Sequence, residues 1–453
     1  MQMRQQRAKG TIAAFLVVTT LFFAWGFITS LNDPVVTAVK GIFCLTDFRA
    51  QLSAFAFFIA YGVMSFPAAV LLSRRKSIPT ILIAFAMMIA GCLFMLAAAN
   101  LATYLLVLVG LFVLASGITI LQVAANPLAA ALGDPKYSHF RLTFSQAFNS
   151  LGTFIGPWLG AVLFLKGIET KECAGTSAAA RLGSLAGIDR AYFWICALIA
   201  ALALFFILFR RTVTEAAPPS SHEAERLGVG GMVRDALSSR WALFGGAAIF
   251  LYVGAEVAIG TQMAFFLHSD AIWGRSDAPF SVPLLGHIMG SDGVFGVSAQ
   301  EAGKAVALYW GGAMVGRLVG AGLLARVPAG RLLALFTAIA AAMCLYVALV
   351  GGVAAGYVAL SIGLFNSIMF PVIFTLTLER SSASEEATSG FLCTAIVGGA
   401  AVPPLVGAVS GAVGYATALV VPAACYGLLC LFALAAARAP ARAGLLDSGA
   451  TVH

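Results

Sequence analysis

The stretch GITILQVAANPLAAALG, residues 117–133, closes an apolar run at 101–132 that carries no charged side chain. A helix needs about 20 apolar residues to cross the hydrocarbon core of a bilayer. The run therefore predicts a membrane-spanning helix. Gln122 and Asn126 lie four residues apart within it, so the two amides share one face of that helix.

The composition of the whole chain extends this prediction. Of 453 residues, 61% are hydrophobic and only 10% are charged, with a mean hydropathy of +0.96. Soluble globular domains carry about 25% charged residues. We therefore expect an all-α, polytopic membrane protein that lies in a lipid bilayer. The net charge of +8 is better explained by cytoplasmic loops than by nucleic-acid binding.

Apolar runs separated by charged or turn-rich breaks predict twelve transmembrane helices. They lie at about 11–39, 49–73, 78–98, 101–132, 141–166, 190–209, 241–267, 300–325, 330–351, 353–379, 387–413 and 415–437.

The distribution of lysine and arginine predicts the orientation. Eighteen of these residues lie in segments on the side of the N-terminus, and eight lie in segments on the other side. Because basic residues concentrate in cytoplasmic loops, we expect both termini in the cytoplasm and a multi-pass protein of the inner cell membrane.

A charged, Pro/Ser-rich segment divides the predicted helices six and six. It contains EAAPPSSHEAE and has the composition of a linker. We expect an N-terminal six-helix bundle at 1–209, a cytoplasmic linker at 210–240, and a C-terminal six-helix bundle with a short tail at 241–453.

The two halves resemble each other weakly. Setting LQVAANP (121–127) on FNSIMFP (365–371) places Gln122 on Asn366, at an offset of 244 residues. PWLGAV at 157–162 matches PLVGAV at 404–409, at an offset of 247 residues. Transporters often carry such repeats, with the substrate site at the repeat interface near mid-membrane. The pattern predicts two pseudo-symmetric bundles.

Two acidic residues interrupt the apolar segments. Asp33 lies in SLNDPVV (30–36), where Pro34 disfavours helical geometry, and Glu256 lies in LYVGAEVAIG. An intramembrane carboxylate is costly and usually functional, so both are candidates for cation coupling. Asp33 could instead sit in a turn at a helix end. Glu256 could instead form a structural ion pair with Arg317, the one basic residue far from the ends of the predicted helices.

Amides form a second polar group within the predicted helices. Gln122 and Asn126 share one helix face, and Gln146 and Asn149 share another. An amide donates and accepts hydrogen bonds at once, which suits the hydroxyls of a sugar. Amides also join membrane helices to one another, and this alternative stays open. Trp25, Tyr61, Tyr252, Tyr309 and Trp310 could stack on sugar faces or simply pack.

Motifs of soluble enzymes are missing from the sequence. It contains neither G-x-x-x-x-G-K-[ST] nor H-E-x-x-H, and its five histidines lie in predicted loops or at the terminus. We expect a transporter rather than an enzyme, with no cofactor and no metal. Spacing alone leaves open whether Cys44 and Cys173 pair, and the outer loop 268–299 has no assigned role.

As a set, six motifs resemble the fucose and glucose/galactose permease branch of the major facilitator superfamily, over nearly the whole chain. They are FFAWGFITSLNDP, GITILQVAANPLAAALG, RLTFSQAFNSLGTFIGP, YVGAEVAIG, GGAMVGRLVG and NSIMFPVIF. The resemblance implies twelve helices in two bundles. It also implies a role in proton coupling for Asp33 and places Gln146 and Asn149 in or beside the sugar cavity.

The chain departs from the fucose permeases at three places. Gln122 stands where they have a glutamate, Glu256 stands where they have a glutamine, and SRRKS (73–77) lacks the usual aspartate of its loop. The first two features look more like the glucose/galactose branch. They indicate that the acidic role has moved between the halves.

The combined expectation is uptake of a hexose, glucose or galactose, by proton-coupled symport in a monomer. Burial generally disfavours an ionised carboxylate, so a buried carboxyl can take up a proton near neutral pH. Sodium is the rival coupling ion, and a proton-driven drug exporter and a sugar sensor are further alternatives. The coupling candidates are Asp33 and Glu256. The substrate-binding candidates are Asn32, Gln122, Asn126, Gln146, Asn149, Glu256 and Asn366.

Overall fold

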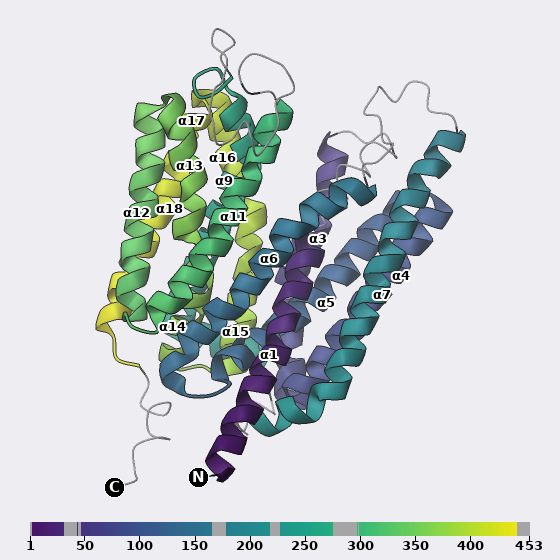
Figure 1. The fold of residues 1–453 in the computed structure, drawn as a ribbon, viewed down its shortest axis with the longest axis vertical. Coiled ribbons are helices and arrows are strands. Elements are labelled where there is room, and N and C mark those ends of the chain that lie inside the picture. Colours follow the sequence, from purple (N-terminus) through teal and green to yellow (C-terminus); the bar gives the residue numbers. More distant parts are fainter. Residues whose placement is uncertain are drawn as a thin grey trace. The chain divides into compact units, whose positions relative to one another are not determined.

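The computed structural model describes residues 2–30, 43, 47–164, 178–217, 227–274, 297 and 299–441, and these residues are almost entirely helical (Figure 1). The first half contains α1 (Gln2–Ser30), α3 (Asp47–Arg75), α4 (Ser77–Leu101), α5 (Tyr104–Ala131), η1 (Pro135–Tyr137), α6 (Ser138–Phe164), α7 (Ala178–Ala216) and α8 (Val229–Ser238). The second half contains α9 (Arg240–His268), α11 (Ala299–Leu324), α12 (Ala329–Val350), α13 (Gly352–Asn366), α14 (Met369–Arg380), α15 (Glu385–Thr394), η3 (Ala395–Val397), α16 (Gly398–Val413), α17 (Tyr415–Ala418) and α18 (Val420–Arg438).

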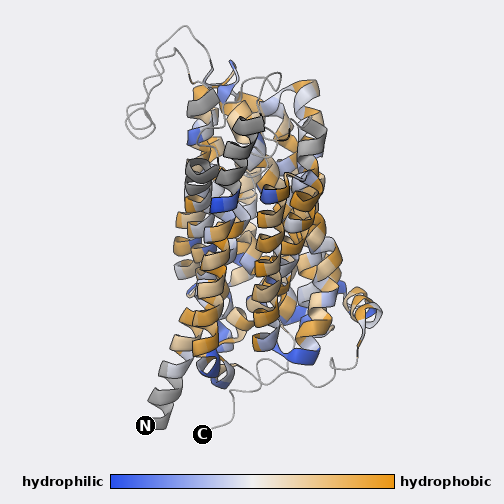
Figure 2. Ribbon diagram, turned by 90° about the vertical axis from the view of Figure 1, so that its right-hand side faces the viewer, coloured by the Kyte–Doolittle hydropathy of each residue, from blue (hydrophilic) through white to orange (hydrophobic). Residues whose placement is uncertain are grey.

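These helices account for the twelve predicted spans. Among the described residues, eleven helical stretches are long and apolar enough to cross a membrane. The remaining predicted span coincides with α6, which is 27 residues long. In Figure 2 much of the helical ribbon is orange, the colour of hydrophobic residues. Large apolar side chains such as Leu208 and Leu349 are exposed, as expected for a surface that faces lipid rather than water.

Three predicted spans are broken helices rather than continuous ones. The span Gly352–Arg380 consists of α13 and α14, the span Glu385–Val413 consists of α15, η3 and α16, and the span Tyr415–Arg438 consists of α17 and α18. Pro371 follows the first break, and it has no amide hydrogen to donate to the carbonyl of Ser367, four residues earlier. Apolar periodicity alone does not distinguish such a pair of short helices from one long helix.

The chain forms two compact units. Unit 1 comprises Met1–Leu243, Ser381–Ala395 and Arg442–His453, and unit 2 comprises Phe244–Arg380 and Ile396–Ala441. Unit 1 therefore contains α15, although that helix belongs to the second half of the sequence. The predicted boundaries at residues 209 and 241 remain a prediction about how the bundles divide.

Unit 1 is built on close helix pairs, α4 with α5, α1 with α6, and α3 with α5. Gly152 allows α6 to approach α1, since a Cβ at this position would lie 2.5 Å from the amide nitrogen of Phe27. Gly390 does the same for α15 on α3, where a Cβ would lie 2.8 Å from Cβ of Ala69 and 3.1 Å from the carbonyl oxygen of Ser65.

The predicted linker contains the short helix α8. Met232 and Ala236 of α8 are fully buried against Ala387 of α15, with Phe66 and Val70 of α3 beside them. Asp235 fastens the same contact, because its Oδ2 accepts hydrogen bonds from N (3.0 Å) and Oγ (2.7 Å) of Ser384, the N-cap residue of α15. The described part of the predicted linker is thus docked within unit 1.

Unit 2 pairs α12 with α18, α11 with α13, and α12 with α13. Its core includes three fully buried tyrosines, Tyr252, Tyr309 and Tyr426. A buried tyrosine hydroxyl usually finds a hydrogen-bond partner, and the hydroxyls of Tyr309 and Tyr426 both contact a predicted site residue of this unit.

Candidate functional site

Two predicted site residues cannot be placed. Asn32 and Asp33 lie outside the residues that the structure describes, as do most of the outer loop at 268–299 and both Cys44 and Cys173. The roles of these residues stay predictions. The other six candidate residues divide between the two units.

In unit 1, α5 and α6 bring their amide faces together. Gln146 Nε2 donates to Asn126 Oδ1 at 3.4 Å, and Gln122 Nε2 donates to the hydroxyl of Tyr61 on α3 at 2.9 Å. Asn126 is fully buried, and its Nδ2 has no hydrogen-bond partner. The two helix faces predicted from residue spacing therefore meet in one polar cluster that includes α3.

Asn149 extends this cluster to α1. With its amide turned to match its neighbours, the Asn149 oxygen accepts from Trp25 Nε1 at 2.6 Å and from the amide nitrogen of Gly26 at 3.2 Å. The orientation of an amide is assigned from its hydrogen bonds rather than observed. Trp25 is buried, so the contact orders both an amide and an aromatic ring at the α1–α6 crossing.

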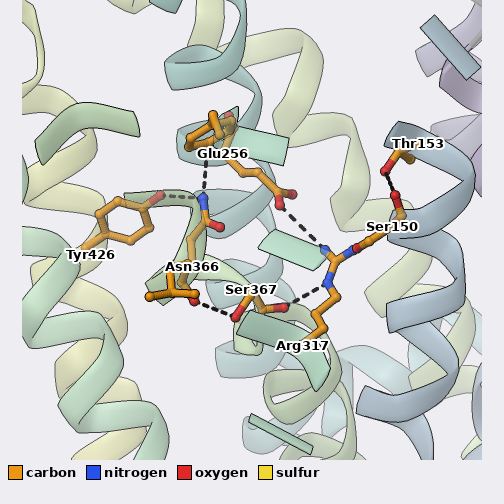
Figure 3. A network of polar contacts seen from close by, with 9 residues as sticks. Ser150, Thr153, Glu256, Arg317, Asn366, Ser367 and Tyr426 are labelled. Carbon is orange, nitrogen blue, oxygen red and sulfur yellow. Dashed lines mark hydrogen bonds and ion pairs between the residues drawn. The ribbon is translucent and has the colours of Figure 1, made fainter. Parts of the chain in front are cut away.

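In unit 2, Glu256 forms an ion pair with Arg317. Arg317 Nη2 lies 3.6 Å from Glu256 Oε1, and both side chains are largely buried (Figure 3). This distance is too long for a hydrogen bond, and Glu256 Oε1 has no hydrogen-bond partner. The structure thus contains the ion pair that the sequence left open as the alternative for Glu256. An ion pair does not by itself exclude a coupling role.

Arg317 is held at the break between α13 and α14. Its Nε donates to the carbonyl oxygen of Ser367 at 2.9 Å. That carbonyl lies four residues before Pro371 and so receives no helical hydrogen bond from residue 371. The proline therefore makes an acceptor available for the arginine.

The repeat-related proline of unit 1 does the same. Pro127 leaves the carbonyl of Val123 without its helical donor, and Ser389 Oγ of α15 donates to that oxygen at 2.9 Å. The alignment of LQVAANP with FNSIMFP places Val123 on Ser367. Each half thus uses a carbonyl freed by proline to bind a side chain from another helix.

Asn366 lies fully buried between two tyrosines. Its Nδ2 donates to the hydroxyl of Tyr309 at 2.6 Å and lies 3.4 Å from that of Tyr426. The Tyr309 hydroxyl in turn donates to the backbone oxygen of Glu256 at 3.1 Å. Asn366 and Glu256, two of the predicted site residues, are therefore linked through one tyrosine.

The sequence did not reveal several functions of these side chains. It left open whether Tyr61 and Tyr309 stack on a sugar or simply pack, and the structure buries both and uses their hydroxyls to hold amides. For these two contacts a signal was available in the internal repeat, since Tyr61 precedes Tyr309 by 248 residues and Gln122 precedes Asn366 by 244. Tyr426 was missed, and the repeat gave no signal for it.

The chemistry of the cluster suits polar ligands and charge more than metal binding. Within the described part of the chain, no group of three or more His, Cys, Asp or Glu side chains could hold a metal ion. The described clusters offer amide donors and acceptors in unit 1, and a carboxylate with an arginine in unit 2. Such groups can bind hydroxyls and respond to a cation.

Comparisons with known proteins agree with this fold. The sequence model of the family described as Major Facilitator Superfamily matches residues 11–395. The glucose/galactose transporter of Brucella abortus biovar 1 (strain 9-941) is 37% identical over 423 residues, which cover 93% of each chain. The L-fucose-proton symporter of Escherichia coli (strain K12) is 29% identical over 444 residues, 94% of each chain.

A solved structure is similar over almost the entire chain. The crystal structure of a major facilitator superfamily transporter, the fucose symporter FucP in the outward conformation, matches with a TM-score of 0.78 and 27% identity, covering 94% of this chain and 99% of that one. The predicted all-α fold is confirmed. This chain belongs to the major facilitator superfamily of membrane transporters, in the branch that contains the glucose/galactose and fucose permeases.

Proposed function

We propose that this protein takes up a hexose, glucose or galactose, together with a proton, by alternating access of two six-helix bundles. It acts as a monomer in the inner cell membrane with both termini in the cytoplasm. The observation that carries the proposal is the joined amide cluster of α5 and α6, in a chain that is 37% identical to a protein named a glucose/galactose transporter.

The amide cluster supplies the sugar contacts in this proposal. Gln122, Gln146 and Asn149 donate to and accept from sugar hydroxyls. Asn126 is fully buried and orients Gln146 through their mutual contact. The buried ring of Trp25, held by Asn149, borders the same cluster and suits the apolar face of a pyranose.

The two carboxylates supply the coupling. Protonation of Glu256 would end its attraction to Arg317, which would remain held by the carbonyl of Ser367. Asp33 is the second coupling group by its sequence position. A change of charge at such residues alters the relative stability of two conformations, which is what coupling requires.

Transport by purified protein in liposomes tests the proposal. Labelled glucose and galactose uptake is measured under an inward proton gradient, under an inward sodium gradient, and with neither. We expect accumulation with the proton gradient only, and its loss in Asp33→Asn with exchange of sugar across the membrane retained. Accumulation under the sodium gradient alone would show that sodium, and not the proton, is the coupling ion. If neither sugar is exchanged at all, the proposed substrate is wrong.

A further inference from the structure

Among the residues that the structure describes, each half contains a tyrosine–amide contact between corresponding helices. Tyr61 on α3 accepts from Gln122 on α5, and Tyr309 on α11 accepts from Asn366 on α13. The helix pairs α3–α5 and α11–α13 both pack closely. The residue offsets, 248 and 244, agree with the internal repeat. The two contacts are therefore equivalent by position and chemistry.

The two contacts differ in what surrounds them. Gln122 keeps 7% of its surface exposed, whereas Asn366 keeps 0%. Both amide hydrogens of Asn366 face tyrosine hydroxyls, Tyr309 at 2.6 Å and Tyr426 at 3.4 Å. A sugar hydroxyl cannot reach Asn366 in this arrangement without displacing a tyrosine.

The Tyr309 hydroxyl also makes a second hydrogen bond. It has one hydrogen, which goes to the backbone oxygen of Glu256 at 3.1 Å, so it must accept from Asn366. The direction of both hydrogen bonds is thereby fixed. Removal of either Asn366 or the hydroxyl would loosen the hold on the α9 backbone at Glu256 (Figure 3).

We infer that Asn366 and Tyr309 are positioning residues for the coupling carboxylate of Glu256, and that Asn366 does not bind the sugar. Gln122, the repeat-related amide, is the sugar ligand of the two. The inference rests on the proposed hexose symport. It assigns sugar affinity to the amide of unit 1 and proton coupling to the amide of unit 2.

The groups around Glu256 make a loss of position measurable. The charged and titratable side chains that interact with it are Arg317 and Tyr309 of α11, Tyr252 of α9 and Tyr426 of α18. α16, which packs on α9 near Ala258, contributes Val402 and Val406, which do not titrate. A shift of the carboxylate relative to Arg317 will therefore change how uptake depends on pH.

The experiment compares three variants and one control variant in liposomes with glucose and galactose as probes. Asn366→Leu keeps the side-chain volume, removes the amide and also removes an Oδ1 that has no hydrogen-bond partner. Tyr309→Phe and Tyr61→Phe each remove one hydroxyl and keep the ring. Tyr357→Phe is the matched control, because its hydroxyl has no hydrogen-bond partner. Sugar exchange without a gradient gives KM, and gradient-driven uptake gives the accumulation ratio and the pH profile.

We expect Asn366→Leu and Tyr309→Phe to keep the exchange KM within about twofold of wild type while accumulation falls at least fivefold and the pH profile shifts. Tyr61→Phe should do the reverse, with KM raised about fivefold and the pH profile unchanged, as the loss of one hydrogen bond implies. Tyr357→Phe should match wild type.

Two results would overturn the inference. One is an exchange KM raised tenfold or more in Asn366→Leu, since this is the behaviour of a sugar ligand. The other is wild-type accumulation and a wild-type pH profile in both Asn366→Leu and Tyr309→Phe. If Tyr309→Phe does not fold, Asn366→Leu alone decides. Failure of the proposed function is seen separately, as absent exchange of both sugars by the wild-type protein.

Discussion

Arg317 and Glu256 form an ion pair whose side chains are only 8% and 12% exposed, with 3.6 Å between Nη2 and Oε1. Two opposite charges removed from water depend on each other, because the desolvation cost of each is offset by the other. The pair joins α11 to α9, and Arg317 also binds the carbonyl of Ser367 at the break between α13 and α14. Three helical segments of unit 2 therefore meet at one arginine.

Removal of one partner should cost more stability than removal of both. Arg317→Met leaves the Glu256 carboxylate buried without a counter-charge, and breaking such a pair costs about 3–5 kcal/mol. Arg317→Met combined with Glu256→Gln leaves no charge and should recover most of that loss. Thermal unfolding in detergent measures both. Equal stability of the single and double variants would show that the charges do not stabilise each other.

The sequence predicted that Glu256 lies within the membrane, and it offered Arg317 as a possible partner without showing that the two side chains meet. An acidic residue far from either end of an apolar segment can be found from hydropathy, and Arg317 was the one basic residue far from the ends of the predicted spans. The partners of Asn366 and Gln122 were not predictable, because tyrosine hydroxyls lie 57 and 61 positions away on other helices. Such pairing depends on helix rotation, which apolar sequence specifies weakly.

The helix breaks were also hidden from periodicity, although the prolines were visible. Pro127 and Pro371 are equivalent in the repeat, yet α5 runs continuously past Pro127 and the span around Pro371 divides into α13 and α14. The proline removes the same hydrogen bond in both places, so its presence alone does not decide whether the helix breaks. The donor to the freed carbonyl differs between the two places, and the sequence alone reveals neither the serine of α15 nor the arginine of α11.

The hydrogen bonds between Asp235 of α8 and Ser384, the N-cap residue of α15, should contribute to the stability of unit 1. Asp235→Ala removes both bonds to Ser384, which caps α15 through the amide nitrogen of Ala387. A half-buried charged acceptor and a weakened N-cap together imply a loss of about 2 kcal/mol. Hydrogen exchange should report faster opening of α15. Arg234→Ala, on the exposed side of α8, is the control and should leave α15 unchanged. If the amides of α15 exchange equally slowly in Asp235→Ala and in wild type, these hydrogen bonds do not stabilise α15.

The contact of α15 with α3 should require glycine at residue 390. In Gly390→Ala the added Cβ would lie 2.8 Å from Cβ of Ala69 and 3.1 Å from the carbonyl of Ser65. Both neighbours belong to a packed helix, so we expect overpacking to cost about 1–3 kcal/mol. Gly427→Ala is the matched control, because nothing lies within 4 Å of its Cβ, and a helical alanine is preferred to glycine. Thermal midpoints of the two variants should therefore move in opposite directions. A Gly390→Ala midpoint at or above wild type would contradict the close approach.

The freed carbonyl of Val123 gives a prediction in which a second substitution restores what the first removes. Ser389→Ala deletes the donor to this buried oxygen, and an unsatisfied buried acceptor costs about 1–3 kcal/mol. Pro127→Ala supplies the missing helical amide hydrogen four residues on, so the double variant should regain the stability that Ser389→Ala loses. Thermal unfolding of the two single variants and the double variant gives the coupling between them. If the double variant is no more stable than Ser389→Ala, the carbonyl was satisfied by another group and the serine is not its donor in solution.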